Sequence, residues 1–101
     1  MKLLTEELIA RFKQVGNQEN EKDPIVIAKF FNPFGAGKWF ATEYYTADKT
    51  FFGYASIFGD HNDEWGYFSL EELESLGKIE RDLHCGEKRI SEFNIDSLKS
   101  N

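Results

Sequence analysis

The stretch Thr50-Phe51-Phe52-Gly53-Tyr54-Ala55-Ser56-Ile57-Phe58 decides the fold class. Its β-branched and aromatic residues predict a strand whose side chains alternate between the two faces of a sheet. One face collects the small and apolar residues Phe51, Gly53, Ala55 and Ile57, which suits the close approach of a helix. The other face is a row of rings at Phe52, Tyr54 and Phe58. Either loops and the C-terminal tail cover these rings, or the rings form an exposed aromatic patch.

Similar segments flank this strand. Residues 25–31 and 39–45 come before it, and a short segment at 65–68 comes after it. The connections are short and rich in turn-forming residues. Consecutive strands joined in this way predict an antiparallel meander of four strands, to which residues 79–85 add a candidate fifth.

Two helices complete the predicted fold. Residues 6–15 place apolar side chains at helical spacing and follow the capping residue Thr5. Ser69 and Glu72 match the capping box S-x-x-E, which predicts a second helix over residues 70–76. The predicted fold class is α+β, with an antiparallel four- or five-stranded meander sheet, an N-terminal helix and a short capped helix after the fourth strand.

Length and composition predict a single domain over residues 1–101. The chain has ten Phe, four Tyr and two Trp, enough rings for a packed core, and it contains no repeat or internal linker. Its longest uncharged apolar run covers only residues 25–28, which is too short for a membrane-spanning helix, and the first residues lack the features of a secretory signal. The lone Cys85 cannot form an internal disulfide. We therefore expect a cytoplasmic protein that does not engage a membrane.

The charge is unevenly distributed. The chain carries twelve Lys and Arg against eighteen Asp and Glu, for a net charge of −6. Residues 39–76 hold eight of these acids and the single base Lys49. Such a field repels phosphate backbones, so duplex nucleic acid is not an expected partner. It favours a basic partner surface or a cation, or it serves only solubility.

The motifs that would signal a metal or a nucleotide are incomplete. Asp60, Asn62, Glu64 and Glu71 partly imitate a calcium loop, but Trp65 stands where such a loop needs glycine. His61, His84 and Cys85 are too few and too poorly spaced for zinc. The glycine-rich residues 35–38 lead into a strand rather than into the helix that a phosphate loop requires. We expect no cofactor and no metal site.

Several motifs together resemble a known family. The stretches FFG at 51–53, GYFSL at 66–70 and ERDL at 80–83 occur in this order with others from residue 3 to about residue 93. The chain resembles a bacterial domain-of-unknown-function family of small proteins that are often carried on plasmids, phages and integrated elements. The resemblance implies no activity and no catalytic residue.

The expected function is that of a non-enzymatic binding or regulatory module for a protein partner, of which a mobile-element accessory protein is one form. The hypothesis uses the acidic segment 60–74, the aromatic sheet face, or both. The candidate binding residues are Asp60, Asp63, Glu64, Glu71, Glu72, Phe52, Tyr54 and Phe58. An exposed ring patch would serve equally well as the interface of a homodimer.

Two alternatives belong to other classes. A small enzyme could carry an unrecognised site built from Glu43, Arg81, Asp82 and His84 around a cleft. A single-stranded nucleic-acid binder could stack bases on the aromatic face, although such platforms usually have a basic groove.

Overall fold

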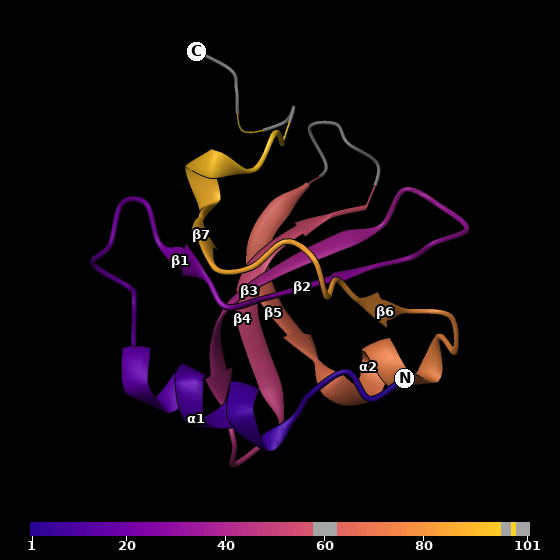
Figure 1. The fold of residues 1–101 in the computed structure, drawn as a ribbon, viewed down its shortest axis with the longest axis horizontal. Helices are drawn as coiled ribbons and strands as arrows, with labels where there is room; N and C mark the ends of the chain where they lie inside the picture. Colours follow the sequence, from indigo (N-terminus) through magenta and orange to yellow (C-terminus); the bar gives the residue numbers. More distant parts are fainter. Residues whose placement is uncertain (58–62, 96–97, 99–101) are drawn as a thin grey trace.

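The fold is built around a five-stranded sheet, with helices on one face and the C-terminal segment across part of the other (Figure 1). In this computed structural model, residues 1–57, 63–95 and 98 are described. The elements are α1 (Glu6–Val15), β1 (Ile25–Val26), β2 (Ala28–Phe31), β3 (Lys38–Tyr45), β4 (Thr50–Ser56), β5 (Glu64–Ser69), α2 (Leu70–Ser75), β6 (Glu80–Arg81), β7 (Lys88–Arg89) and a 3-10 helix (Ile90–Glu92). Among the described residues, no helix has the length and apolar character needed to cross a bilayer.

The main sheet has the strand order β5-β4-β3-β2-β6, and every neighbouring pair in it is antiparallel. Strands β2 to β5 follow one another as a meander, and α2 begins directly after β5. Thr5 caps α1 by accepting the Leu8 N–H, and Ser69 and Glu72 form the capping box of α2. The predicted α+β fold class is confirmed.

Two predicted strands are shorter than expected. The segment 25–31 is divided at Ile27, because β1 pairs with β7 in a separate two-stranded sheet while β2 pairs with β3. The segment 79–85 keeps only β6 as strand. Its second half turns instead, since the Asp82 carboxylate accepts the N–H groups of His84 and Cys85 at 2.8 and 3.1 Å.

The main core lies between the sheet and the helices. Phe51 of β4 is fully buried at its centre, with ring centroids 4.9 to 5.9 Å from those of Phe12, Phe30, Tyr44 and Phe68. Phe12 comes from α1, and Leu73 adds the buried face of α2. Phe51 and Ala55 of the predicted apolar face therefore pack in the core beneath the helices, whereas Ile57 is exposed.

Gly53 serves a different purpose from the one expected. A Cβ built at this position would lie 1.9 Å from the carbonyl oxygen of Phe40 in β3. The small residue is thus required by the backbone of the neighbouring strand rather than by an approaching helix.

The ring face of the sheet is covered over only part of its area. A second cluster packs Val26, Phe40 and Tyr54 against Ile90 and Ile95 of the C-terminal segment. Tyr54 is only 3% exposed, so it belongs to this cluster and not to an accessible patch. Phe52 lies outside the cluster and is half-buried. Of the three predicted rings, Tyr54 is therefore covered and Phe52 is partly covered, whereas Phe58 lies outside the described residues.

We predict that Gly53→Ala is severely destabilising, because the Phe40 carbonyl is backbone and cannot move aside without disturbing β3. The expected loss is more than about 3 kcal/mol of unfolding free energy, measured by urea denaturation. Gly66→Ala is the matched control, since Gly66 lies directly opposite Gly53 and a Cβ there meets nothing within 4 Å. A Gly53→Ala protein as stable as the control would contradict this account.

Candidate functional site

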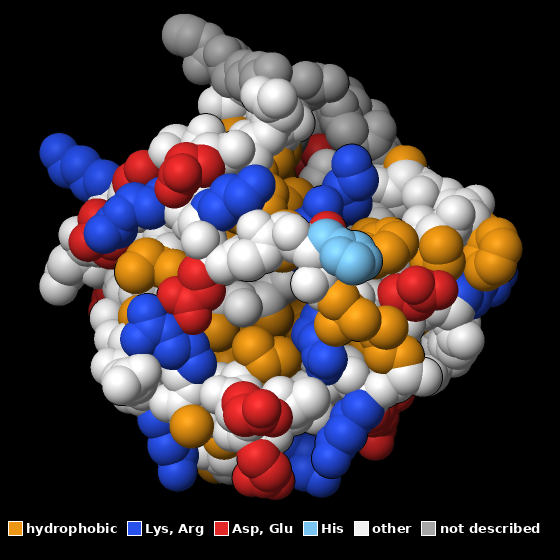
Figure 2. All heavy atoms as spheres, in the orientation of Figure 1, with side chains coloured by type: hydrophobic (Ala, Val, Ile, Leu, Met, Phe, Trp, Pro, Cys, Tyr) orange, Lys and Arg blue, Asp and Glu red, His pale blue; other side chains and the backbone are white. Residues whose placement is uncertain are grey.

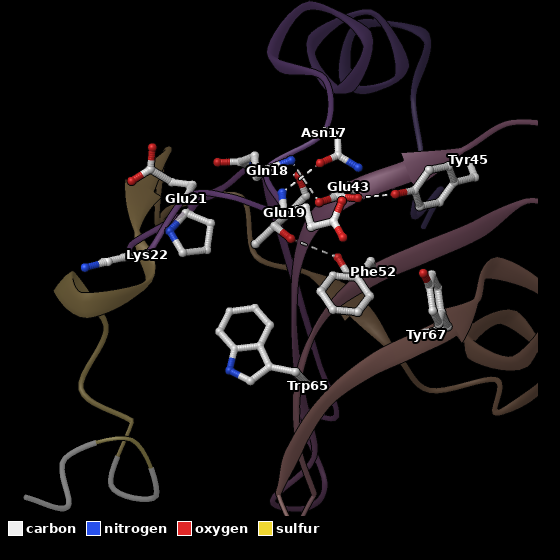
Figure 3. A pocket seen from close by; sticks show the side chains of 12 residues that line it. Asn17, Gln18, Glu19, Glu21, Lys22, Glu43, Tyr45, Phe52, Trp65 and Tyr67 are labelled. Carbon is white, nitrogen blue, oxygen red and sulfur yellow. Dashed lines mark hydrogen bonds between the residues drawn. The ribbon is translucent and has the colours of Figure 1, made fainter.

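The uncovered part of the ring face forms one wall of an open pocket of about 460 Å³ (Figure 3). We call it the ring pocket. Strands β3, β4 and β5 supply its sheet side, and the loop of residues 17–24 supplies the opposite wall. Its main side chains are Gln18, Glu43, Tyr45, Phe52, Trp65 and Tyr67.

An irregularity in β3 turns Glu43 toward this pocket. Ala41 pairs with Gly53 and Glu43 pairs with Phe52, so Thr42 is an extra residue on β3. Ala41 and Tyr44 both pack in the main core although they are three residues apart, a spacing that regular alternation would place on opposite faces. The bulge therefore moves Glu43 and Tyr45 together to the ring face, which is the outer face of the sheet.

Glu43 is a buried carboxylate at the floor of the ring pocket. It is only 6% exposed. One oxygen accepts the backbone N–H of Gln18 at 2.9 Å, and the other accepts the hydroxyl of Tyr45 (Figure 3). No Lys or Arg among the described residues forms an ion pair with it. The carboxylate thus has neutral donors that fix its position, and no described cation that neutralises it.

Gln18 attaches the loop wall to the strands. Its side-chain amide donates to the carbonyl oxygens of Ile25 and Thr42 at 2.9 and 2.8 Å, and its side-chain oxygen accepts the Ile25 N–H at 2.7 Å. All the polar groups of this amide except one lone pair are therefore used within the fold. This arrangement holds the loop in position beside Glu43.

The rings form a connected group along the outer face. Phe52 contacts Trp65 in a near-parallel arrangement at 6.1 Å and Tyr67 in an edge arrangement at 5.0 Å between centroids. Tyr67 also lies 6.3 Å from Tyr45. Tyr67 is 70% exposed, which is high for a large aromatic residue.

The charges around the pocket are mainly negative. Glu19 and Glu21 stand in the loop wall with Lys22, and Glu43 lies below them. Glu21 is within 3.6 Å of Arg89 on the exposed surface. Three carboxylates therefore line the pocket against one ammonium group.

The hydrogen bond between Tyr45 and Glu43 has an electrostatic consequence. This bond, with smaller contributions from burial and from the negative charge, raises the pKa of Tyr45 to about 12. The phenol is a donor that stays protonated throughout the neutral pH range.

The acidic residues predicted to bind a partner do not form one cluster, and some of them make structural hydrogen bonds. The Asp63 carboxylate accepts from the Ser56 hydroxyl and the Ile57 N–H at 2.7 and 3.0 Å, so it stabilises the end of the β4–β5 connection. Glu64 is exposed on β5. Glu71 and Glu72 are exposed in the first turn of α2, where Glu72 accepts the Ser69 N–H. Asp60 and Phe58 lie outside the described residues.

Of the predicted rings, Phe52 lies in the pocket and Tyr54 does not. Tyr45, Trp65 and Tyr67 also line the pocket and were not among the binding residues expected from the sequence. The alternation rule applied to residues 65–68 would have found two of them, because Trp65 pairs with Tyr54 and Tyr67 pairs with Phe52.

The four residues of the hypothetical enzyme site are not brought together. Glu43 faces the ring pocket, whereas Arg81 and Asp82 line a separate pocket between the start of α1 and residues 81–87. The Arg81 guanidinium donates to the carbonyl oxygens of Lys2 and Leu3 at 2.5 and 3.2 Å, and Asp82 forms an ion pair with Lys29 at 3.3 Å. His84 is exposed. On the face drawn in Figure 2, basic and acidic side chains are interspersed.

The possible metal ligands are not grouped either. Within the described residues, no three His, Cys, Asp or Glu side chains are arranged to hold an ion. Much of the partial calcium motif, at residues 60–62, lies outside them. Burial raises the pKa of the Cys85 thiol, which reduces its nucleophilic thiolate fraction.

We predict that Glu43→Gln lowers the pKa of Tyr45 from about 12 toward 10, because the charged acceptor that stabilises the protonated phenol is removed. NMR titration of the tyrosine ring carbons checks this, with Tyr45→Phe to assign the signal. The raised pKa of Tyr44 comes first from burial and then from Asp48 and Glu74, so Tyr44 serves as an internal control that stays unchanged.

The same bond predicts a loss of stability at high pH. A phenol with a raised pKa in the folded state stabilises the fold fully below about pH 10, and this contribution disappears as the pH rises toward 12. Wild type should therefore lose more stability than Tyr45→Phe over this range. Equal losses in the two proteins would contradict the assignment.

Comparison with known proteins gives a family and no activity. No curated protein and no solved structure matches the chain. A family model described as "Protein of unknown function (DUF2958)" matches residues 3–97, nearly the whole chain. The chain therefore belongs to the DUF2958 family of proteins of unknown function.

Proposed function

We propose that this protein is a non-enzymatic binding module that holds a basic segment of a partner protein on the ring pocket. The supporting observation is the Glu43 carboxylate, buried beneath exposed rings and without an ion-pair partner among the described residues. A buried carboxylate is costly unless a cation or several donors compensate for its lost hydration. A Lys or Arg side chain entering the pocket would supply that cation.

The rings suit the same ligand. An ammonium or guanidinium group over the face of Trp, Tyr or Phe gains about 0.5 to 2 kcal/mol, depending on how far it is desolvated. Phe52, Trp65 and Tyr67 provide three ring systems beside Glu43. The aliphatic stem of a basic side chain can pack on the rings while its charged end reaches the carboxylate.

A protein partner fits better than a free small cation. The pocket is open, and Glu19 and Glu21 in its loop wall add negative charge beside Glu43. Tyr and Trp are enriched at protein interfaces, and complementary charge steers association. Single-stranded nucleic acid could use the rings, but the carboxylates that line the pocket would repel its phosphates.

The finer form of the proposal concerns the partner. The resemblance to proteins carried on plasmids and phages favours an accessory protein of a mobile element, acting in the cytoplasm on a nucleic-acid-binding protein of the host. Such a partner has basic segments that normally face phosphate. One of these basic segments would bind in the negatively charged ring pocket.

We predict that selection from a random nonapeptide library on phage enriches Lys and Arg when wild-type protein is the target. Selected peptides should bind Glu43→Gln at least tenfold more weakly, because the substitution removes the buried charge. Glu80→Gln, which makes the same charge change on β6 at the other edge of the sheet, should bind them unchanged.

Ring variants give a second comparison. Tyr67→Ser should weaken binding, whereas Phe34→Ser, which removes a ring that is 82% exposed away from the pocket, should not. Selected peptides with no excess of basic residues, or with equal affinity for wild type and Glu43→Gln, would contradict the proposal. Selection of acidic peptides would contradict it as well.

Salt provides an independent test. Because the proposed attraction acts partly between exposed charges, affinity for a selected peptide should fall roughly tenfold between about 50 mM and 500 mM NaCl, measured by isothermal titration calorimetry. An affinity that does not change over this range would mean that apolar contact alone drives binding.

A further inference from the structure

The outer edge of β5 is an open end of the main sheet. β5 pairs with β4 on one side, and no strand in the described residues pairs with its other side. Unpaired strand edges can be extended by another chain, so proteins usually protect them with charges, bulges, prolines or covering segments. β5 has six residues and no proline.

The hydrogen-bond pattern shows which backbone groups point outward from this edge. Leu70 donates to the Lys49 carbonyl at 3.0 Å, so the pair formed by these residues is a hydrogen-bonded one. Hydrogen-bonded and non-hydrogen-bonded pairs alternate in an antiparallel ladder. The next pair, Thr50 with Ser69, is therefore non-hydrogen-bonded, and so are Phe52 with Tyr67 and Tyr54 with Trp65. The N–H and C=O groups of Trp65 and Tyr67 thus point away from β4.

The end of β5 agrees with this assignment. The Ser69 N–H also points away from β4, and it is occupied by the Glu72 carboxylate at 3.0 Å in the capping box of α2. The capping box therefore closes the edge at Ser69. Trp65 and Tyr67 are the two residues of β5 whose outward-facing backbone groups remain to pair with an added strand.

The side chains of the same two residues lie in the ring pocket. A strand added beside β5 would place every second side chain next to Trp65 and Tyr67 on the pocket face. Backbone pairing and occupation of the pocket by basic side chains are therefore compatible in one extended segment.

Charge decides between a basic segment and a second copy of this chain. Asp63 and Glu64 lie at one end of β5, and Glu71 and Glu72 follow its other end. A twofold pairing centred on Gly66 would place the acids at the start of one β5 near those that follow the other. Negative charges of the two copies would then lie close to each other at both ends, although they are not directly paired across the strands. An extended segment with Lys or Arg residues instead carries charge opposite to these acids and to Glu19, Glu21 and Glu43 of the ring pocket.

We propose that β5 receives an extended basic segment of the partner as a sixth strand, paired through the N–H and C=O groups of Trp65 and Tyr67, with alternate Lys or Arg side chains directed to the ring pocket. This inference rests on the proposed function and adds the mode of binding, which is β-strand addition. The backbone supplies hydrogen bonds that do not depend on sequence, and the pocket supplies the preference for basic side chains.

The test uses the synthetic peptide Ac-Thr-Val-Arg-Val-Arg-Val-Arg-Val-Thr-NH2 and two derivatives. One derivative carries N-methyl groups on the Arg amides, and the other carries them on the Val amides. In an added strand the N–H groups of only one of these two sets point toward β5. N-methylation of that set should weaken binding more than tenfold, and N-methylation of the other set should change the affinity less than threefold. Loss in the Arg set corresponds to antiparallel pairing and loss in the Val set to parallel pairing. Equal effects of the two sets would overturn the inference.

The parent peptide separates this inference from the proposed function. Binding that Glu43→Gln weakens but that responds equally to both methylation patterns would leave the basic pocket in place and remove strand addition. Failure of the parent peptide to bind at low salt would contradict both. Strand addition without the Glu43 effect would overturn only the role of the pocket.

Two protein variants test the edge from the other side. Tyr67→Ser and Tyr67→Pro both remove the ring, and only the proline also removes the outward N–H, which the β4 ladder does not use. The proline variant should bind the parent peptide at least tenfold more weakly than the serine variant, and equal affinities would overturn the inference. Sedimentation equilibrium of wild type should show a monomer, and a dimer that competes with the peptide would assign the edge to a second copy instead.

Discussion

The contact between β3 and β4 at Gly53 is the constraint on which the rest of the structure depends. The Phe40 carbonyl occupies the space that a side chain at Gly53 would need. Next to this contact on β3, the extra residue Thr42 shifts the pairing register between β3 and β4. This bulge allows Tyr44 to join the main core while Glu43 and Tyr45 both turn to the outer face. The buried carboxylate of the ring pocket is therefore a consequence of how two central strands meet.

The C-terminal segment determines how much of the outer face remains available. Ile90 and Ile95 cover Tyr54 and Phe40, which lie next to Phe52 and the other open rings along the same face. The rings that remain stand beside a loop that the amide of Gln18 attaches to β1 and β3. A single sheet face thus has a covered part that stabilises the fold and an open part with a fixed carboxylate.

Much of the fold could be predicted from local patterns. Thr5 and Ser69 cap helices as expected, and the alternation of β4 places Phe51 inward. Local patterns were less informative where a strand changes partner, as at Ile27, or where one side chain closes a turn, as Asp82 does. At Ile27 pairing with distant strands outweighs β propensity, and at Asp82 a local side-chain hydrogen bond does so.

The sequence by itself determined the α+β class, the strand and helix types, the negative charge of residues 39–76 and the presence of rings on one sheet face. Only the tertiary structure decided that Tyr54 is covered, that Phe52, Trp65 and Tyr67 share an open pocket, and that Glu43 lies beneath them. The physical reason is that alternation assigns a side chain to a face, whereas burial depends on which distant segment packs over that face. Here residues 88–95 cover part of the ring face and residues 17–24 stand beside the part that stays open, and neither segment is near β4 in the sequence.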